Sequence, residues 1–229
     1  MKLLFLCLIL SCSSPTSENN KNPYGLDIVD NIERYKQSLK GNPDMELLDL
    51  ESAIPNVQLD IRYATKNNFT AEIIYTDAKA FARLKVAQAL KKVQDSLQFH
   101  NLGLRIYDAY RPYAATLKFF EVYPDTNFVA NPRYGSRHNR GCAIDLTLID
   151  LSTGEEIPMP TEFDDFSEKA DPNYMDLPQE VIENRTFLFS IMSHFGFSHY
   201  PTEWWHFDFE GWENFPLMDL SFKELMQSK

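Results

Sequence analysis

The sequence predicts an α+β fold, with a mostly antiparallel central sheet flanked by helices. Helical and strand-like segments interleave along the chain, yet several neighbouring strand-like segments lack the connecting helix that parallel pairing requires. The 229 residues, 44% of them hydrophobic, are enough for one domain with a substantial core. A mixed fold with direct strand-to-strand connections therefore fits the pattern better than a parallel α/β sheet.

Four helices are expected where apolar residues recur every three or four positions. Pro112 suits the first turn of the third helix, and Gly41 and Gly196 suit the ends of the first and the fourth. In chain order the helices cover 24–40, 78–97, 112–122 and 178–195. Strands are expected where apolar and polar residues alternate, at 57–63, 104–107, 141–149, 197–200 and 206–209.

The N-terminus has the pattern of a bacterial lipoprotein signal. Lys2 precedes a short apolar run that is too short to span a bilayer, and Ser11 precedes Cys12. We expect 1–11 to be a signal peptide and a lipid on Cys12 to anchor the chain to a membrane, on the periplasmic or cell-surface side. A plain secretory signal and a poorly ordered tail are the alternatives. The expected organisation continues with a polar tether (12–23), a helical extension (24–45) and a catalytic domain (46–229).

Charge and cysteine content narrow the function. The formal net charge of -11 argues against a nucleic-acid-binding protein, which usually carries a basic face. No obligate protein partner is evident. Of the three cysteines only Cys142 lies outside the N-terminal segment, so no disulfide is expected within the domain. Cys142 is expected to be a buried small hydrophobic residue, with a nucleophile as the alternative.

Two motifs carry the chemistry: a serine, a histidine and an aspartate at Ser136, His138 and Asp145, and a Glu-Trp-Trp-His run from Glu203 to His206. Two histidines and one aspartate form the open three-ligand set of a catalytic zinc site, whose fourth position holds water. We therefore expect one Zn²⁺ per chain. Glu203 is the candidate for the base that takes a proton from that water.

The strand pattern supports this grouping. On 141–149, Asp145 lies on the face opposite Ile144 and its apolar neighbours, and on 206–209 His206 shares a face with Asp208. Pairing the two strands brings Asp145 near His206; a polar face exposed to water is the alternative. Glu203 can face the same centre only if a turn or bulge interrupts the alternation.

Other polar residues have simpler interpretations. His100 and His194 lie at helix ends, whereas His199 is the competing candidate for a metal ligand. Arg111 follows a strand end and is a candidate to stabilise an oxyanion. The alternative for Arg111 is a salt bridge to Asp108 that fixes the corner of the chain.

At these motifs the sequence resembles the D-alanyl-D-alanine dipeptidases, metallopeptidases with the hedgehog/D,D-peptidase fold. The matching segments, 60–69, 107–112, 136–146, 159–164 and 203–206, span most of 50–210 in the family's order. The resemblance implies zinc on the two histidines and Asp145, Glu203 as general base and acid, and Arg111 on the scissile carbonyl. It further implies substrate contacts by Ser136 (carboxylate), by Asp164 and Tyr63 (ammonium), and a positioning role for Asp108.

The resulting expectation is zinc-dependent hydrolysis of D-Ala-D-Ala, or of a similar small dipeptide, in peptidoglycan turnover or dipeptide salvage. One alternative is a D,D-carboxypeptidase or endopeptidase that acts on peptidoglycan peptides. Another, of a different class, is a catalytically inactive wall-binding module. Glu203 argues against the last, because a binding module has no use for a proton shuttle.

Overall fold

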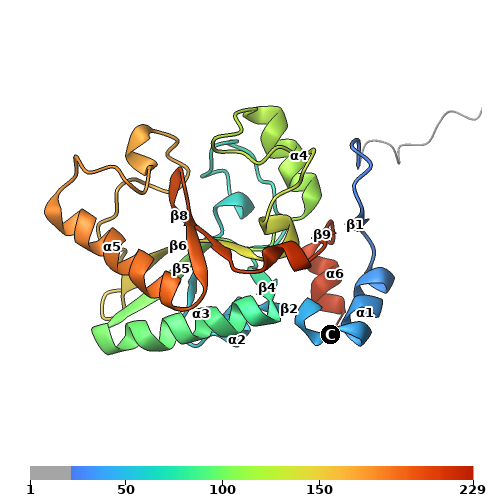
Figure 1. The fold of residues 1–229 in the computed structure, drawn as a ribbon, viewed down its shortest axis with the longest axis horizontal. Helices are drawn as coiled ribbons and strands as arrows, with labels where there is room; N and C mark the ends of the chain where they lie inside the picture. The colour runs from blue at the N-terminus through green and yellow to red at the C-terminus, as the bar shows by residue number, and fades with distance from the viewer. Residues whose placement is uncertain (1–21, 229) are drawn as a thin grey trace, which may run out of the picture.

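The computed structural model describes residues 22–228, so the expected signal peptide and Cys12 lie outside the described residues. The centre of the fold is a five-stranded sheet in the order β3-β5-β6-β8-β7 (Figure 1). β3 and β5 pair in parallel, and the other neighbours pair antiparallel. The expected α+β class is therefore confirmed. The strands are β3 (Gln58–Leu59), β5 (Leu102–Asp108), β6 (Ala143–Asp150), β7 (Phe197–Tyr200) and β8 (Glu203–Phe209).

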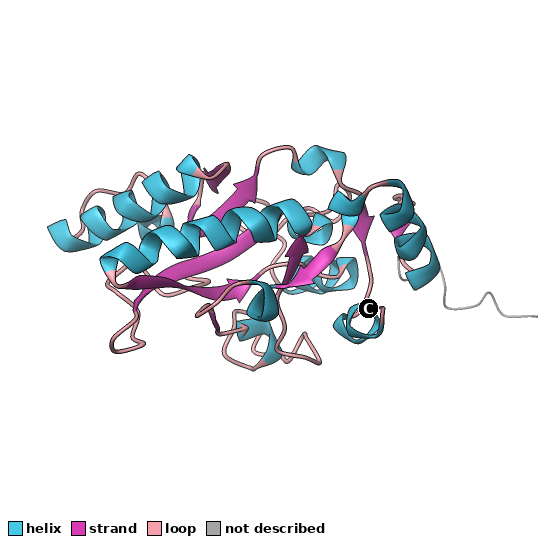
Figure 2. Cartoon of the chain, turned by 90° about the horizontal axis from the view of Figure 1, so that it is seen from below, coloured by secondary structure: helices cyan, strands magenta, loops and turns pink. Residues whose placement is uncertain are grey.

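Helices cover the sheet. Figure 1 shows the long helix α3 on one side of the sheet and α4 on the opposite side, and Figure 2 shows helices lying across the sheet when it is seen from below. Gln94 of α3 accepts a hydrogen bond from the backbone of Leu104 at 2.8 Å, which fixes the helix to β5. None of the described helices combines the length and apolar character that a membrane crossing needs. The larger helices are α3 (Leu84–Leu97), α4 (Tyr113–Val122) and α5 (Gln179–His194).

Two small sheets of two strands each lie outside the five-stranded sheet. β1 (Ile28–Val29) pairs in parallel with β9 (Leu217–Met218), and β2 (Leu47–Asp49) pairs antiparallel with β4 (Phe81–Arg83). The short helices are α1 (Ile32–Gly41), α2 (Leu50–Ala53) and α6 (Phe222–Gln227). Single 3-10 turns lie at Pro43–Met45, Arg62–Ala64, Gln98–His100, His138–Arg140, Glu168–Ala170 and Trp212–Asn214.

Three expected elements differ most from the observed bounds. The first helix begins only at Ile32, because the side chain of Asn31 accepts a hydrogen bond from the Arg34 backbone and so caps it there. The second helix begins at Leu84, because the three residues before it pair with β2. The strand expected at 57–63 is limited to two residues, which are followed by a 3-10 turn.

β6 lies at the centre of the sheet and of the core. Its residues from Ala143 to Ile149 are all buried, including the apolar face of Ile144, Leu146 and Leu148 that the alternation predicted. Both faces of this strand are therefore covered. Any polar side chain on β6 must find its partners inside the protein.

Candidate active site

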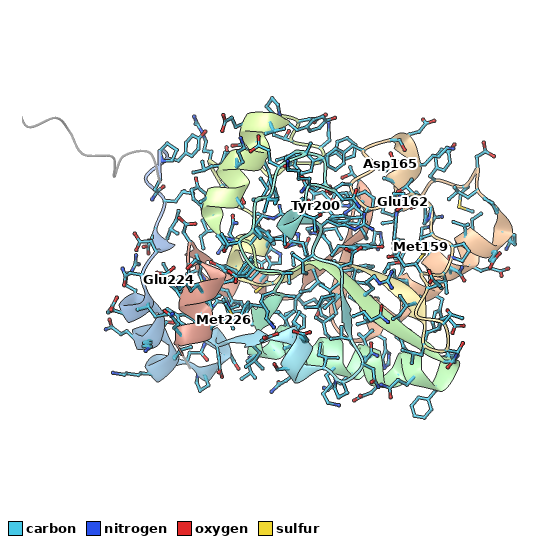
Figure 3. The ribbon with its side chains drawn as sticks, turned by 180° about the vertical axis from the view of Figure 1, so that it is seen from behind. Met159, Glu162, Asp165, Tyr200, Glu224 and Met226 are labelled. Atoms are coloured by element: carbon cyan, nitrogen blue, oxygen red, sulfur yellow. The ribbon has the colours of Figure 1, made fainter. Side chains whose placement is uncertain are left out.

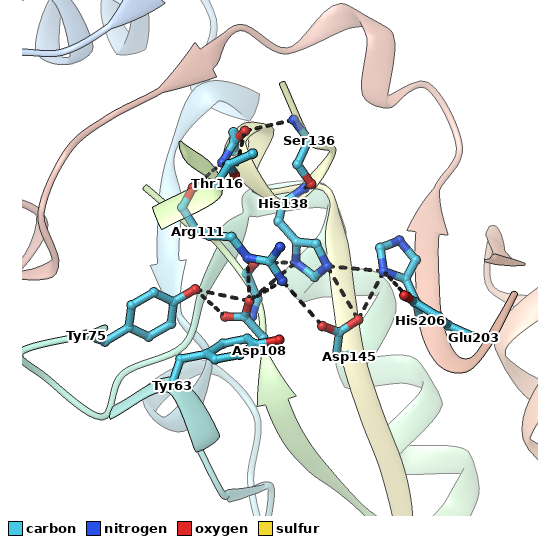
Figure 4. A network of polar contacts seen from close by, with 12 residues as sticks. Tyr63, Tyr75, Asp108, Arg111, Thr116, Ser136, His138, Asp145, Glu203 and His206 are labelled. Atoms are coloured by element: carbon cyan, nitrogen blue, oxygen red, sulfur yellow. Dashed lines mark hydrogen bonds and ion pairs between the residues drawn. The ribbon is translucent and has the colours of Figure 1, made fainter. Parts of the chain in front are cut away.

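β6 and β8 bring the expected metal ligands together. Asp145 and His206 are direct partners in the antiparallel register, and His138 reaches them from the 3-10 turn before β6. His206 Nδ1 lies 3.1 Å from Asp145 Oδ1, and His138 Nε2 lies 3.4 Å from the same oxygen (Figure 4). One donor atom from each residue falls within 4.8 Å of the other two. The three side chains thus surround one point.

The donor set fits a zinc ion. Asp145 Oδ1 is buried and accepts no hydrogen bond within the described residues, so it is an orphaned acceptor beside two imidazole nitrogens. Burial by itself raises the pKa of Asp145, but the imidazoles of His138 and His206 outweigh it and hold that pKa below its usual range. An ionised carboxylate with two imidazole nitrogens is the ligand type of open zinc sites.

The outer nitrogens of both histidines are also held. His138 Nδ1 lies 2.7 Å from the carbonyl oxygen of Ala109, and His206 Nε2 lies 3.0 Å from Asp208 Oδ1. Such contacts fix ring orientation and tautomer in metal sites, and a carboxylate partner also makes the ligating nitrogen more basic. The geometry therefore directs His138 Nε2 and His206 Nδ1 toward the shared point.

The edge strand β4 holds the two loops that supply His138 and Arg111. Its Phe81 carbonyl accepts a hydrogen bond from the Tyr110 backbone at 2.7 Å, and the Arg83 backbone donates to the Gly141 carbonyl at 3.0 Å. Gly141 has φ +71°, and a Cβ there would lie 2.6 Å from a Leu47 methyl group. Glycine suits this turn, because its backbone conformation is strained for a residue with a side chain and a Cβ would also displace the Leu47 methyl group.

Glu203 faces the same centre. The register between β7 and β8 shifts between His199 and Tyr200, so the expected irregularity is present. Glu203 Oε2 consequently lies 3.6 Å from His206 Nδ1, although the two residues are three apart. Burial raises the pKa of Glu203 to about 8, an effect that the His206 imidazole opposes. A carboxyl group of this pKa can both accept and return a proton near neutral pH.

Arg111 and Asp108 form a buried ion pair beside the metal ligands. The Nη2 atom of Arg111 lies 2.8 Å from Asp108 Oδ2 and 3.7 Å from Asp145 Oδ2. Tyr75, on a preceding loop, donates to the Asp108 carboxylate at 3.0 Å. The guanidinium also lies over the ring of Phe119 at 4.7 Å. The salt bridge considered from the sequence is therefore present, and it also aims the guanidinium at the metal-ligating group.

The residues expected to bind substrate line the same cavity. Tyr63 donates to Asp164 Oδ1 at 3.0 Å, whereas Asp164 Oδ2 is buried and has no hydrogen-bond partner among the described residues. Burial raises the pKa of Asp164 to about 8, and the nearby carboxylate of Asp145 adds to the effect. Ser136 Oγ accepts a hydrogen bond from the His138 backbone at 3.2 Å, which leaves its hydroxyl hydrogen free for a ligand.

The remaining sequence candidates lie elsewhere. His199 stacks on Phe189 at 4.5 Å between ring centroids and is absent from the metal-ligating group of the described residues. Cys142 is a free, buried thiol, and burial raises its pKa to about 12, so it is no nucleophile. Tyr75 and the ion pair between Arg137 and Asp208 were not identified from the sequence. Of these residues, only Asp208 is indicated by the sequence, because strand alternation places it on the same face as His206.

Known proteins match most of the chain. The family model described as D-ala-D-ala dipeptidase, of the peptidase M15 group, matches residues 43–223. A D-alanyl-D-alanine dipeptidase of Escherichia coli (strain K12) is 35% identical over 173 residues, which are 76% of this chain and 89% of that protein. One from Enterococcus faecium is 32% identical over 69% of this chain and 88% of that protein.

A solved structure of low sequence similarity also matches. It is the vancomycin-resistance D,D-pentapeptidase VanY in complex with Zn(II), which is 16% identical. The match covers 58% of this chain and 75% of that chain, with a TM-score of 0.38.

Proposed function

Because this chain belongs to the D-alanyl-D-alanine dipeptidase family, we propose that it is a zinc dipeptidase that hydrolyses free D-Ala-D-Ala, or a similar dipeptide, to two amino acids. The observation that carries the proposal is the convergence of His138, Asp145 and His206 beside a buried glutamate of raised pKa. Zinc, when bound by these three residues, acidifies its water and polarises the scissile carbonyl. A dipeptide substrate is supported by the polar groups arranged around that centre.

The surroundings of each side chain in the site determine its role in hydrolysis. Glu203 takes a proton from the attacking water and returns it to the leaving amine, for which a pKa of about 8 is suitable. Arg111 is held by Asp108 and supplies positive charge where the oxyanion develops. The unpaired Asp164 Oδ2 accepts a hydrogen bond from the substrate ammonium, and the Ser136 hydroxyl donates to the substrate carboxylate.

Hydrolysis assays on the purified protein test this function. We expect cleavage of D-Ala-D-Ala that a chelator abolishes and added Zn²⁺ restores. We also expect much slower cleavage of the same dipeptide with an acetylated amine, because a neutral amide cannot pair with Asp164. Faster cleavage of blocked peptides than of the free dipeptide would favour a carboxypeptidase or endopeptidase instead. Absence of any hydrolysis at full zinc occupancy would favour the inactive binding module.

The cellular role is proposed from the N-terminal sequence. A lipid on Cys12 would tether the enzyme outside the cytoplasm, where it would meet dipeptides released during peptidoglycan turnover or taken up for salvage. Cytoplasmic precursor dipeptides would then be out of its reach. Labelling with a fatty-acid analogue, compared between the native protein and Cys12→Ala, tests the anchor. An unlabelled, cytosolic native protein would overturn this location.

A further inference from the structure

Part of the cavity around the metal-ligating residues, which we call its second end, has no role in the proposed cleavage of D-Ala-D-Ala; its two arginines lie over aromatic rings of the same cavity wall. This end is lined by Arg137, Arg140, Tyr200 and Trp212. The whole cavity has a volume of about 660 Å³, within the range of sites that hold drug-sized ligands. D-Ala-D-Ala carries only a methyl group as each side chain and is much smaller. A larger substrate group can therefore occupy the remaining space.

This second end lies within reach of the cleaved bond. The ring of Tyr200 is 5.0 Å from the ring of His206, and the Arg137 guanidinium is 5.4 Å from the Tyr200 ring. Figure 3 shows Tyr200 on the α4 side of the central sheet. The carboxylate of Asp208 also links His206 to Arg137, because it contacts both side chains. One extended residue spans about 3.5 Å, so the side chain of the residue next to the cleaved bond can reach Arg137.

The charge at this end is positive. Arg137 pairs with Asp208 through Nη1 at 3.1 Å, and its other guanidinium nitrogens donate no hydrogen bond within the described residues. Arg140 donates to the Phe215 carbonyl and forms no ion pair with any described residue. The two guanidinium groups thus form one ion pair among the described residues, that of Arg137 with Asp208, and the charge of Glu213 also acts on Arg140. Donors of Arg137 remain available to an anionic ligand.

Arg137 is also held in place. Its guanidinium lies over the ring of Trp212 at 4.8 Å as well as over that of Tyr200, and its side chain is 35% exposed. A cation fixed between two rings and a carboxylate loses little side-chain entropy when it binds a ligand. This preorganisation distinguishes Arg137 from Arg133 in the same loop, which is exposed and does not line the cavity.

The polarity of the cavity sets the direction of the substrate. Asp145, Asp164 and Glu203 are the acidic residues that line it, and Asp164 is the proposed partner of the substrate ammonium. Ser136, the proposed contact of the substrate carboxylate, directly precedes Arg137 in the chain. The carboxyl-terminal residue of the dipeptide therefore lies on the side of Arg137.

We propose that Arg137, together with Tyr200 and Trp212, forms a subsite for an anionic side chain on the carboxyl-terminal residue of the dipeptide. The preferred substrates are then dipeptides whose leaving residue is acidic, such as a glutamate. Arg137 is the specificity-determining residue, because it supplies the charge-assisted hydrogen bonds that a neutral side chain of the same size cannot match. The inference rests on the proposed dipeptidase function.

The test compares D-Ala-D-Glu with D-Ala-D-Gln, which have the same size and differ in side-chain charge. The wild-type protein should show a kcat/KM about 10- to 100-fold higher for the glutamate dipeptide, the range of one charge-assisted hydrogen bond. The ratio should fall toward one in Arg137→Gln, and in the wild-type protein it should shrink as ionic strength rises. Arg133→Gln, which removes the same charge from the same loop, should keep the wild-type ratio.

The ratio is measured within one protein, so a change of zinc content through Asp208 and His206 cancels. Zinc occupancy of each variant is measured in parallel. Hydrolysis of D-Ala-D-Ala together with equal kcat/KM for the two test dipeptides would overturn the subsite alone. A full glutamate preference in Arg137→Gln would overturn it as well. Failure to hydrolyse any of the three dipeptides at full zinc occupancy would overturn the proposed function and the subsite with it.

Discussion

Replacing Asp164 with asparagine should change how the stability of the metal-free protein depends on pH. Asp164 is half-buried and has φ +62°. Tyr63 donates to its Oδ1, whereas its Oδ2 is buried and has no partner within the described residues. Burial raises its pKa to about 8 in the folded protein. In the unfolded chain an aspartate has a pKa of about 4. The folded state therefore binds this proton more tightly than the unfolded state does.

This difference in proton binding sets the sign of the pH dependence of stability. The contribution of a group whose folded-state pKa is raised is fully present below the unfolded pKa and is lost as pH rises through the folded pKa. For Asp164 the loss runs from about pH 4 to about pH 8, with a slope of at most about 1.4 kcal/mol per pH unit. The upper limit of the total is about 6 kcal/mol. Asp164→Asn does not titrate, so its stability relative to wild type should increase across this window.

Urea unfolding in the presence of a chelator, at pH 5, 7 and 9, measures the difference between the two proteins. Tyr63→Phe provides a matched comparison, because it removes the hydrogen bond that favours the charged carboxylate. The stability of Tyr63→Phe should keep falling up to a higher pH than that of wild type, because the pKa of Asp164 rises further. In the double variant with Asp164→Asn this difference should disappear. A difference between Asp164→Asn and wild type that is the same at all three pH values would refute the assignment of a raised pKa to Asp164.

Three further predictions concern the metal site and its support. Glu203→Gln should keep zinc and lose at least about 100-fold in kcat, and near-normal turnover would show that another group moves the proton. Asp208→Ala should weaken zinc binding about 10- to 100-fold, measured by competition with a chelator, because His206 loses its outer partner; unchanged affinity would contradict that role. Arg83→Met should lower the free energy of unfolding in urea by about 2–4 kcal/mol, because the buried guanidinium donates hydrogen bonds to backbone carbonyls of three segments. A loss below about 1 kcal/mol would argue against that function of Arg83.

The part of the site that lies on regular strands was predictable from the sequence. Alternation on 141–149 placed Asp145 opposite a buried apolar face, and the structure pairs it with His206. The spacing of Glu203 and His206 required an irregular strand, and the register shift between β7 and β8 supplies it. In both cases a two-residue period determines which side chains share a face, so local sequence is sufficient.

Contacts between distant segments were not predictable in the same way. Tyr75 reaches Asp108, and Arg137 reaches Asp208, only because the tertiary fold brings their loops together. The helix expected at 78–97 was predicted to begin too early, since it begins only at Leu84. Its apolar period begins at Ala82, but pairing of Phe81–Arg83 with β2 outweighs helix propensity there. Periodicity identifies buried faces, whereas partner choice depends on segments that sequence spacing does not locate.

Residues 22–42, which lie outside the family match, are connected to the catalytic loops by a continuous set of contacts. The hydroxyl of Tyr35 on α1 accepts a hydrogen bond from the Leu47 backbone at 2.8 Å, and β2 in turn pairs with β4. β4 holds the turn of His138 through the Gly141 carbonyl. Because a zinc ligand must be held in place before the metal binds, any contact that orders this turn lowers the cost of assembling the site. We therefore expect residues 22–42 to help order the metal site, although none of these described residues lines the cavity.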